Sequence, residues 1–365
     1  IQVRNRENNQ LLQVRAKVFI DATYEGDVAA AAKVPYRIGR EGRDETGEPY
    51  AGVFYQYFGT KEIYPDPRTG QGDHRIQAYN YRLCLTNRPE LRIYPEKPAT
   101  YNREDYAALV DDIREKRVTR FGRSPNDTAG VFNIVPVPNG KSDTNNHHNG
   151  LISTDLPEEN QEWPEETWKW REKFSQRLRD YTLGLLWFTQ NDPELPDWFR
   201  EQAREWGLAK DEYGDNGQFR RQVDVREGRR MLGEYDFSAH DAVVAPGAPR
   251  TAIHPTTITA AHYAIDSHAL RKREPGKLAL DGFLGMGHIT SPYTVPFGVM
   301  VPQKVDGLLV PVAVSATHLG FGTLRMEPCW MAMGQAAGVA ANLAIAEQVA
   351  PRAVPLRKLQ KELIR

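Results

Sequence analysis

The sequence predicts an α/β protein in which the two ends of the chain build one domain and a long middle segment builds another. Near the N-terminus, a strand through residues 18–20 is followed by a turn and an alanine-rich helix over 28–33. Near the C-terminus, a strand over 307–315 is followed by a polar, glycine-containing loop and a helix over 328–346. The middle, 38–302, mixes helix and strand patterns without an internal repeat.

The first elements follow from local patterns. Apolar and polar residues alternate on both sides of a polar turn at residues 5–9, which predicts a β-hairpin. Its second arm continues into the strand that ends at Asp21. We expect this strand to be buried. The helix that follows must end before Val34-Pro35, because a residue preceding proline avoids the α region.

The C-terminal helix has an unusual start and an unusual face. Pro328 suits the first helical turn, where its missing N–H costs nothing. The start of a helix carries partial positive charge and several N–H groups, so behind a strand it favours an electron-rich ligand. Gly334 and Gly338 are four residues apart and share a face. We expect this face to pack closely on a sheet, with a flat ligand against the helix start.

The middle segment predicts several further elements. They are a surface loop over 40–50, a long loop over 64–73, a strand over 77–86, helices over 104–116 and 165–191, and turns and short strands over 281–300. We expect Arg229, Arg230 and Glu234 on one helix, as a surface or inter-domain ion pair. Six of the seven tryptophans gather here, at 163, 168, 170, 187, 198 and 206. Packing explains them better than stacking on sugar rings, which stays the alternative.

Composition excludes several classes of protein. The chain has 365 residues, 40% of them hydrophobic and 26% charged, with a formal net charge of −1. This charge gives no electrostatic case for binding nucleic acid or an anionic membrane. We see no apolar run close to the roughly 20 residues that span a bilayer. Two cysteines, Cys84 and Cys329, make a disulfide framework improbable, and we expect Cys329 to be a packed neutral thiol rather than a thiolate.

Two polar clusters resemble a metal site and a catalytic triad but have simpler interpretations. Residues 141–150 contain Asp143, His147 and His148, yet neighbouring side chains of a strand alternate in direction and no metal-ligand spacing is present. We therefore predict an Asx-rich turn and no metal. Asp266-Ser-His268 has the letters of a catalytic triad, but sequence adjacency is not triad geometry.

The two end segments together resemble a known family. Residues 18–27 (Val-Phe-Ile-Asp-Ala-Thr-Tyr-Glu-Gly-Asp) and 315–328 (Ser-Ala-Thr-His-Leu-Gly-Phe-Gly-Thr-Leu-Arg-Met-Glu-Pro) look like bacterial FAD-dependent oxidoreductases, which are distant relatives of glutathione reductase and fumarate reductase. The similarity extends through 77–86, 141–146, 206–211 and 225–235, so it covers most of the chain. One departure is Tyr24, which stands where the wider class usually has glycine.

The resemblance implies a fold. Residues 1–37 and 303–365 would form part of an FAD/NAD(P)-binding, Rossmann-like domain of the glutathione reductase type, and 38–302 an inserted, mixed α+β substrate or cap domain. Such proteins begin with a strand, Gly-x-Gly-x-x-Gly and a helix that holds the pyrophosphate, and this motif is absent from the sequence. We therefore expect a preceding segment of the same protein to complete the FAD site, without which the chain need not hold FAD or be active.

The resemblance also implies site residues. The residues expected at the FAD are Asp21, Ala22, Thr23, Gly26, Asp27, Gly322, Thr323, Met326 and Glu327; those expected to line the substrate are Asp143, Asn145 and Asn146. His318 and Arg325 would then face the substrate. Arg325 suits a carboxylate or a developing oxyanion, and His318 suits proton transfer. The simpler alternatives are that Arg325 only bridges to Glu327 or a phosphate and that His318 only caps a loop.

The function implied is hydride transfer to FAD from a small-molecule or carbohydrate-related substrate. Two other classes stay open: a non-catalytic binding module that keeps the flavoprotein fold, and a polysaccharide lyase or hydrolase that uses the tryptophan-rich insert. A second glycine-rich motif is missing, so the use of NAD(P)H has no support. The sequence indicates neither the substrate, the electron acceptor, the oligomeric state nor the location in the cell.

Overall fold

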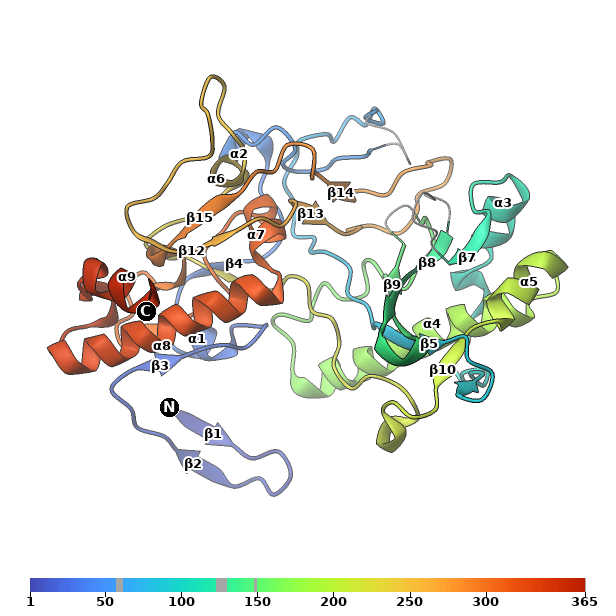
Figure 1. Ribbon diagram of the computed structural model, residues 1–365, viewed down its shortest axis with the longest axis horizontal. Coiled ribbons are helices and arrows are strands. Elements are labelled where there is room, and N and C mark those ends of the chain that lie inside the picture. The colour runs from blue at the N-terminus through green and yellow to red at the C-terminus, as the bar shows by residue number, and fades with distance from the viewer. Residues whose placement is uncertain (57–61, 123–129, 148–149, 365) are drawn as a thin grey trace. The chain divides into compact units, whose positions relative to one another are not determined.

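A computed structural model describes residues 1–56, 62–122, 130–147 and 150–364. The chain divides into two compact units (Figure 1). Unit 1 consists of residues 1–38, 227–266 and 285–365, and unit 2 of residues 39–226 and 267–284.

Unit 1 is built from short strands and a few helices. Its strands are β1 (Gln2–Arg4), β2 (Leu11–Gln13), β3 (Phe19–Ile20), β4 (Tyr36–Arg37), β11 (Arg230–Met231), β12 (Thr257–Ala261), β15 (Tyr293–Pro296) and β16 (Leu308–Leu309). Its helices are α1 (Asp27–Ala31), α6 (Ala239–Ala242), η4 (Phe297–Met300), α7 (His318–Leu324), α8 (Glu327–Glu347), η5 (Pro351–Ala353) and α9 (Leu356–Ile364). β13 (Asp266–Ser267) and β14 (Leu284–Gly285) lie where the chain passes between the units.

The two ends of the chain meet in unit 1, as the sequence predicts. β3 pairs in parallel with β16, with Phe19 opposite Leu308 and Ile20 opposite Leu309. The Asp21 N–H extends the ladder by donating to the Leu309 carbonyl at 2.8 Å. The strand at 308–310 is buried, but Ile20 is 41% exposed. The expectation of a buried N-terminal strand is therefore wrong, because within the described residues β3 has a strand neighbour on one side alone.

The N-terminal hairpin is confirmed. β1 and β2 pair antiparallel over three residue pairs, from Gln2 opposite Gln13 to Arg4 opposite Leu11. Its aliphatic side chains are exposed by 41–50%: Ile1, Val3, Leu11, Leu12 and Val14. The hairpin therefore presents apolar surface that unit 1 itself leaves in solvent.

The loop predicted between the C-terminal strand and helix is instead the helix α7. Thr317 caps it, with the side-chain oxygen accepting from the Gly320 N–H at 3.0 Å. A Cβ on Gly320 would lie 2.4 Å from the Phe237 carbonyl oxygen, and one on Gly322 2.7 Å from that of Asp266. These glycines let the helix approach neighbouring backbone, and this packing outweighs their poor helix propensity.

Helix α8 begins and ends close to the predicted residues, with Pro328 in its first turn. It packs against β3, β12 and α9. The predicted close packing of its glycines is wrong within the described structure, because a Cβ on Gly334 or Gly338 would meet nothing within 4 Å. Its exposed face includes Met331 and Ile345. α8 is also long and apolar enough to cross a membrane by length and composition, contrary to our sequence estimate, although core helices of soluble proteins pass the same test.

Unit 2 contains a six-stranded sheet and the longest helix. Its elements are α2 (Arg43–Thr46), β5 (Leu83–Thr86), β6 (Arg92–Ile93), η1 (Arg103–Asp105), α3 (Ala108–Arg114), β7 (Arg120–Gly122), β8 (Gly130–Val137), η2 (Pro138–Gly140), β9 (Lys141–Asn146), α4 (Trp168–Asn191), α5 (Asp197–Arg204), β10 (Gly207–Ala209) and η3 (Gly214–Asn216). The sheet order is β6-β10-β5-β9-β8-β7, and β7–β8 is its parallel pair. The helices α3 and α4 fall inside the predicted spans.

Two local predictions for the middle segment are wrong. The Asx-rich turn predicted at 141–150 is instead the strand β9 over 141–146. β9 pairs with β5 on one side and with β8 on the other, and this pairing outweighs the turn preference of its polar residues. His148 and Asn149 lie outside the described residues. The helix predicted around Arg229 and Arg230 is the strand β11, and Arg230 is buried rather than on the surface.

The tryptophans of the middle segment mainly pack, as predicted. Trp163 is buried, and its ring meets Tyr79 edge-on at 5.7 Å. Trp170 stacks on Phe174 at 5.6 Å. Trp187 packs edge-on against another aromatic ring, 5.0 Å away. These contacts bury aromatic surface in the core around α4, and they do not support a row of rings that stack on sugars.

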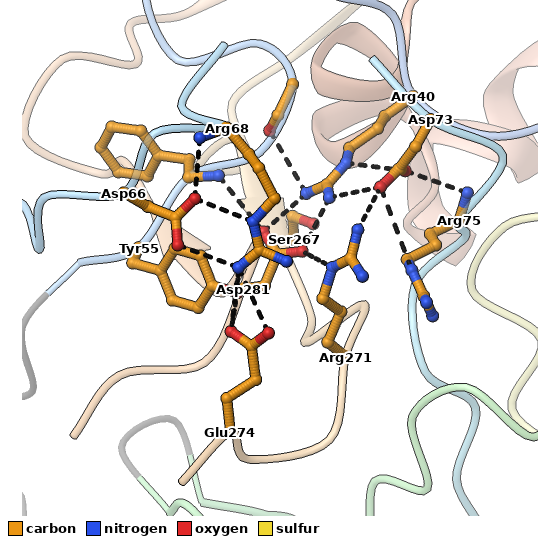
Figure 2. A network of polar contacts seen from close by, with 12 residues as sticks. Arg40, Tyr55, Asp66, Arg68, Asp73, Arg75, Ser267, Arg271, Glu274 and Asp281 are labelled. Atoms are coloured by element: carbon orange, nitrogen blue, oxygen red, sulfur yellow. Dashed lines mark hydrogen bonds and ion pairs between the residues drawn. The ribbon is translucent and has the colours of Figure 1, made fainter. Parts of the chain in front are cut away.

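A buried ion-pair network fixes the loops of unit 2 (Figure 2). The Arg40 guanidinium binds Asp281 with both Nη atoms, at 2.8 and 2.7 Å, and binds Asp73 with Nε and Nη2. Arg271 joins the same two carboxylates at 2.8 and 2.9 Å. The predicted surface loop at 40–50 is therefore anchored at Arg40, and it contains the short helix α2.

The compact units differ from the expected domain boundaries. Residues 227–266 and 285–302, which we expected in the insert, belong to unit 1. The reason is backbone hydrogen bonding to the C-terminal segment. The Met231 N–H donates to the Ala313 carbonyl at 3.1 Å, and the Ser315 N–H donates to that of Val299 at 2.8 Å. The assignment of these units to cofactor and substrate stays a prediction.

Candidate functional site

The turn after β3 is held by a buried carboxylate. Asp21 accepts hydrogen bonds from the Thr23 N–H and hydroxyl, at 3.1 and 2.7 Å, and from the Ala29 N–H in the first turn of α1 at 2.8 Å. Gly26 takes a left-handed φ of 64°, and a Cβ there would lie 3.0 Å from that of Ala313. Asp21 and Gly26 thus shape the turn, while Ala22 and Thr23 are exposed at its tip.

This turn contacts the start of α8. The Tyr24 ring meets the Trp330 ring edge-on, with centroids 5.1 Å apart. Phe321 of α7 lies on the same indole at 6.4 Å. Two segments from opposite ends of the chain therefore meet where the sequence predicts a ligand site, and Tyr24 has a packing role in the position that is usually glycine.

The start of α8 offers hydrogen-bond donors. Its N-cap residue, Met326, makes no side-chain cap, and Glu327 and Pro328 are exposed. Among the described residues, Arg325 Nε and Trp330 Nε1 are buried and have no hydrogen-bond partner. A buried donor without an acceptor costs about 1–3 kcal/mol. The chemistry of these donors fits an electron-rich group such as a carbonyl edge or an anion.

Arg325 is positioned by a carboxylate that sequence reasoning missed. Its Nη2 donates to Asp266 Oδ2 at 2.8 Å, and the Tyr263 hydroxyl donates to the same oxygen at 3.2 Å. Within the described residues, Arg325 pairs with Asp266 and not with Glu327, the partner expected in the simpler alternative. The Arg325 guanidinium is thus held rigidly, with Nε left to donate elsewhere.

His318 belongs to a buried triad of side chains that we call the unit 1 triad: His318, Glu227 and Arg230. His318 Nδ1 lies 3.0 and 2.9 Å from the two Glu227 oxygens. Arg230 Nε lies 3.1 Å from Glu227, and its Nη1 donates to the Ala316 carbonyl at 2.8 Å. Because Thr317 caps α7, the alternative that His318 only caps a loop is wrong. A carboxylate that binds one ring nitrogen fixes the orientation of the imidazole.

Gly322 and Thr323 have protein neighbours. Gly322 lies against the Asp266 backbone, and Thr323 is fully buried. The Thr323 hydroxyl hydrogen-bonds with Tyr293 at 2.8 Å and with the Tyr263 carbonyl. Their contact with FAD stays a prediction that these packing contacts do not strengthen.

Cys329 is a buried neutral thiol, as predicted. Burial raises the pKa of this thiol to about 12, far above working pH. The thiolate at the start of α8, the alternative considered from the sequence, is therefore excluded as the resting form.

The predicted substrate-lining residues of unit 2 separate onto two faces of the sheet. Asp143 and Asn145 share one face of β9, since side chains alternate along a strand. Asn146 points to the opposite, buried face, where its Oδ1 accepts from Arg226 Nη2 at 3.1 Å. Asn146 therefore lies on the other face of the sheet from Asp143 and Asn145, and the contact of these residues with substrate stays a prediction.

The family of this chain can now be stated. The sequence model of a family described as FAD dependent oxidoreductase matches residues 1–363. The chain belongs to this family of FAD-dependent oxidoreductases. No curated protein and no solved structure is significantly similar to it. The protein is therefore an enzyme, an oxidoreductase with FAD as its cofactor.

The oxidoreductase also contains a second triad, which we call the unit 2 triad: His268, Asp155 and Arg226. Asp155 accepts from Arg226 Nη1 and bonds with His268 Nδ1, both at 2.8 Å. Burial by itself would raise the pKa of Asp155, but Arg226 and His268 outweigh it and lower that pKa. His268 and Asp266 thus have separate partners, which agrees with the prediction that Asp266-Ser-His268 is not a catalytic triad.

Asp155 lines a cavity of about 790 Å³ in unit 2. The lining residues come from four segments of the chain and include Glu104, Ser153, Tyr181 and Leu278. Sequence reasoning missed this cavity, because its walls come from segments far apart in the chain that carry no shared motif.

Proposed function

We propose that the oxidoreductase transfers hydride from a small-molecule substrate to FAD, with the electron-rich edge of the cofactor at the start of α8. One observation carries this proposal: buried donors without acceptors, Arg325 Nε and Trp330 Nε1, lie at a helix start that has no side-chain cap. The turn at 21–27 supports it, because Tyr24 contacts Trp330 there. Bound FAD would supply the two-electron acceptor.

Arg325 and His318 are the proposed catalytic residues. Asp266 holds Arg325 through Nη2, so that Nε is oriented to donate to a carbonyl or to an oxyanion that develops during the reaction. Glu227 engages His318 at Nδ1, which assigns Nε2 as the atom that would carry the proton. Asp266 and Glu227 thereby act as positioning residues.

A further segment of the same protein is proposed to complete a Rossmann-like domain of the glutathione reductase type. The exposed α8 face with Gly334, Gly338 and Met331, together with the aliphatic hairpin β1–β2, is apolar surface that suits such a segment. Small residues would let its backbone approach α8 closely. The pyrophosphate of FAD would then lie on a Gly-x-Gly-x-x-Gly turn contributed by this segment.

The substrate would be lined by the sheet face of unit 2 that carries Asp143 and Asn145. The Asp143 carboxylate is ion-paired with Arg82, with Nε donating to Oδ1 at 2.9 Å. This face is polar and partly exposed, whereas the opposite face is packed. The assignment of the cofactor to unit 1 and of the substrate to unit 2 is part of the proposal.

The test is an Arg325→Ala variant of the protein that includes the proposed preceding segment. Because the lost guanidinium would stabilise charge in the transition state, we expect turnover to fall by about 10²–10³-fold. The flavin absorbance of the purified protein should remain. Arg352→Ala, which removes another ion-paired arginine of unit 1, is the matched control and should keep its turnover. Unchanged turnover in Arg325→Ala would remove this residue from the site, and a wild-type protein without flavin absorbance would overturn the proposed placement of FAD.

A further inference from the structure

The sheet of unit 2 presents a polar face, which we define by Arg82, Cys84, Asn133, Asp143 and Asn145. The strand register establishes its central members: Asn133 lies directly opposite Asn145, and Asp143 lies opposite both Val135 and Cys84. Residues directly opposite each other on neighbouring strands share a face. Asn133 thus joins the two residues that the sequence already indicated.

The charged side chains at this face are ion-paired. Arg82 pairs with Asp143, and Lys141 pairs with Asp211 at 2.9 Å and also with Glu212. The two asparagines are neutral. A ligand that contacts the asparagines therefore meets neutral amides beside ion-paired charges, which favours a neutral, hydrogen-bonding molecule over an ion.

Two acceptors on the polar face lack hydrogen bonds. Asn133 is 7% exposed, and its Oδ1 is buried with no partner among the described residues. The Oδ1 of Asn145, on the neighbouring strand, is also buried and has no partner among the described residues. Side chains directly opposite on antiparallel strands have Cβ atoms about 5 Å apart. Buried polar groups normally have hydrogen-bond partners. The pair therefore offers two adjacent acceptors to one ligand.

We propose that Asn133 and Asn145 recognise two neighbouring hydroxyl groups of a neutral, polyhydroxylated substrate. The hydroxyl groups donate to the two Oδ1 atoms, beside the ion pair of Asp143 and Arg82. A sugar or cyclic polyol carries hydroxyl groups on adjacent ring carbons, which can donate to two neighbouring acceptors. Asn133 is then a specificity residue that no sequence motif indicated. This inference rests on the proposed function, because it identifies the substrate of the same site.

The first experiment measures binding of D-glucose, myo-inositol and glycerol to the full chain by calorimetry, with putrescine and acetate as charged probes. We expect a polyol to bind and the charged probes not to bind. Asn133→Leu and Asn145→Leu should each weaken polyol binding by about tenfold, as a lost hydrogen bond does. Gln176→Leu, which removes an exposed amide of the same unit, is the control and should bind like wild type.

A second measurement separates recognition from structure. Since Asn133 Oδ1 has no partner in the described protein, Asn133→Leu should leave the thermal midpoint unchanged or raise it while binding weakens. A lower midpoint would make Asn133 structural and overturn the inference, as would polyol binding that Asn133→Leu leaves intact, or binding of the charged probes alone. Flavin absorbance and Arg325→Ala turnover report on the proposed function separately, so a flavin-containing enzyme that binds no polyol overturns this inference alone.

Discussion

Two histidines of this oxidoreductase have nearly the same surroundings and different positions in the fold. In the unit 1 triad, Glu227 holds His318 and Arg230; in the unit 2 triad, Asp155 holds His268 and Arg226. The first triad includes His318, the first residue of α7, and α7 leads to the start of α8. The second contributes its carboxylate to the wall of a cavity. The same combination of a histidine, an acidic residue and an arginine thus occurs in two environments.

The difference shows that a buried carboxylate–histidine pair does not by itself mark a catalytic centre. Glu227 has a fully buried side chain and is surrounded by protein. Asp155 is also buried but borders space that solvent or a ligand can enter. What assigns His318 to the proposed chemistry is its neighbourhood, because Arg325 and Trp330 supply donors without acceptors close by in the chain. The predictions below test whether this distinction holds.

The largest effect is expected for Glu227→Ala. This substitution leaves the Arg230 charge buried without its carboxylate, which costs about 3–5 kcal/mol of unfolding free energy. Urea unfolding followed by circular dichroism would measure the loss, and hydrogen exchange would locate it in unit 1. Glu227→Gln keeps the shape and should cost less. A loss as small as that of a surface substitution would mean that the triad is not a structural centre of unit 1.

A smaller effect is expected for Asp155→Asn, about 2 kcal/mol, since the amide keeps one acceptor oxygen, so that one hydrogen bond to a charged acceptor becomes weaker and the other is lost. The pKa of Asp155 is lowered by folding, so its stabilisation is present above the unfolded carboxyl pKa of about 4 and is lost as the pH falls below it. Unfolding free energies measured from pH 7 to pH 3 should therefore fall less steeply in the variant. Equal slopes would show that Asp155 does not contribute to the acid sensitivity of unit 2.

The smallest effect is expected for Gly338→Ala on the exposed face of α8. A Cβ there meets nothing within 4 Å, so the higher helix propensity of alanine should stabilise the chain by about 1 kcal/mol. Thermal unfolding of the chain described here measures this gain. In the protein with the proposed preceding segment, the same change should instead weaken packing. A gain of the same size in both forms would contradict the docking of that segment on α8.

The sequence predicted those parts of the site that lie in continuous, patterned segments. The meeting of the chain ends and the start of α8 were predictable, because Val18–Ile20 and Gly307–Val310 read as strands and Pro328 marks a helix start. α7 was predicted as a loop, since the tight backbone contacts that make its glycines favourable come from distant residues. The separation of Asn146 from Asp143 and Asn145 was not predicted, because residues 141–150 were predicted as a turn and side chains alternate between faces only in a strand.

The partners of the catalytic candidates could not be predicted. Glu227 and Asp266 reach His318 and Arg325 across long stretches of chain, and neither lies in a motif that pairs it with them. Asn133 lies in a strand whose partner in register, β9, was not recognised as a strand. In each case the missing information is strand register and the packing of distant segments, which local patterns do not encode.

The parallel pairing of β3 with β16 has a consequence for biosynthesis. Phe19 is translated before unit 2, and its strand partner, Leu308, only after it. Unit 2, most of which is one continuous stretch, can fold while synthesis continues. Strand β3 must wait without its partner strand during that time, which gives the nascent protein a late closing step.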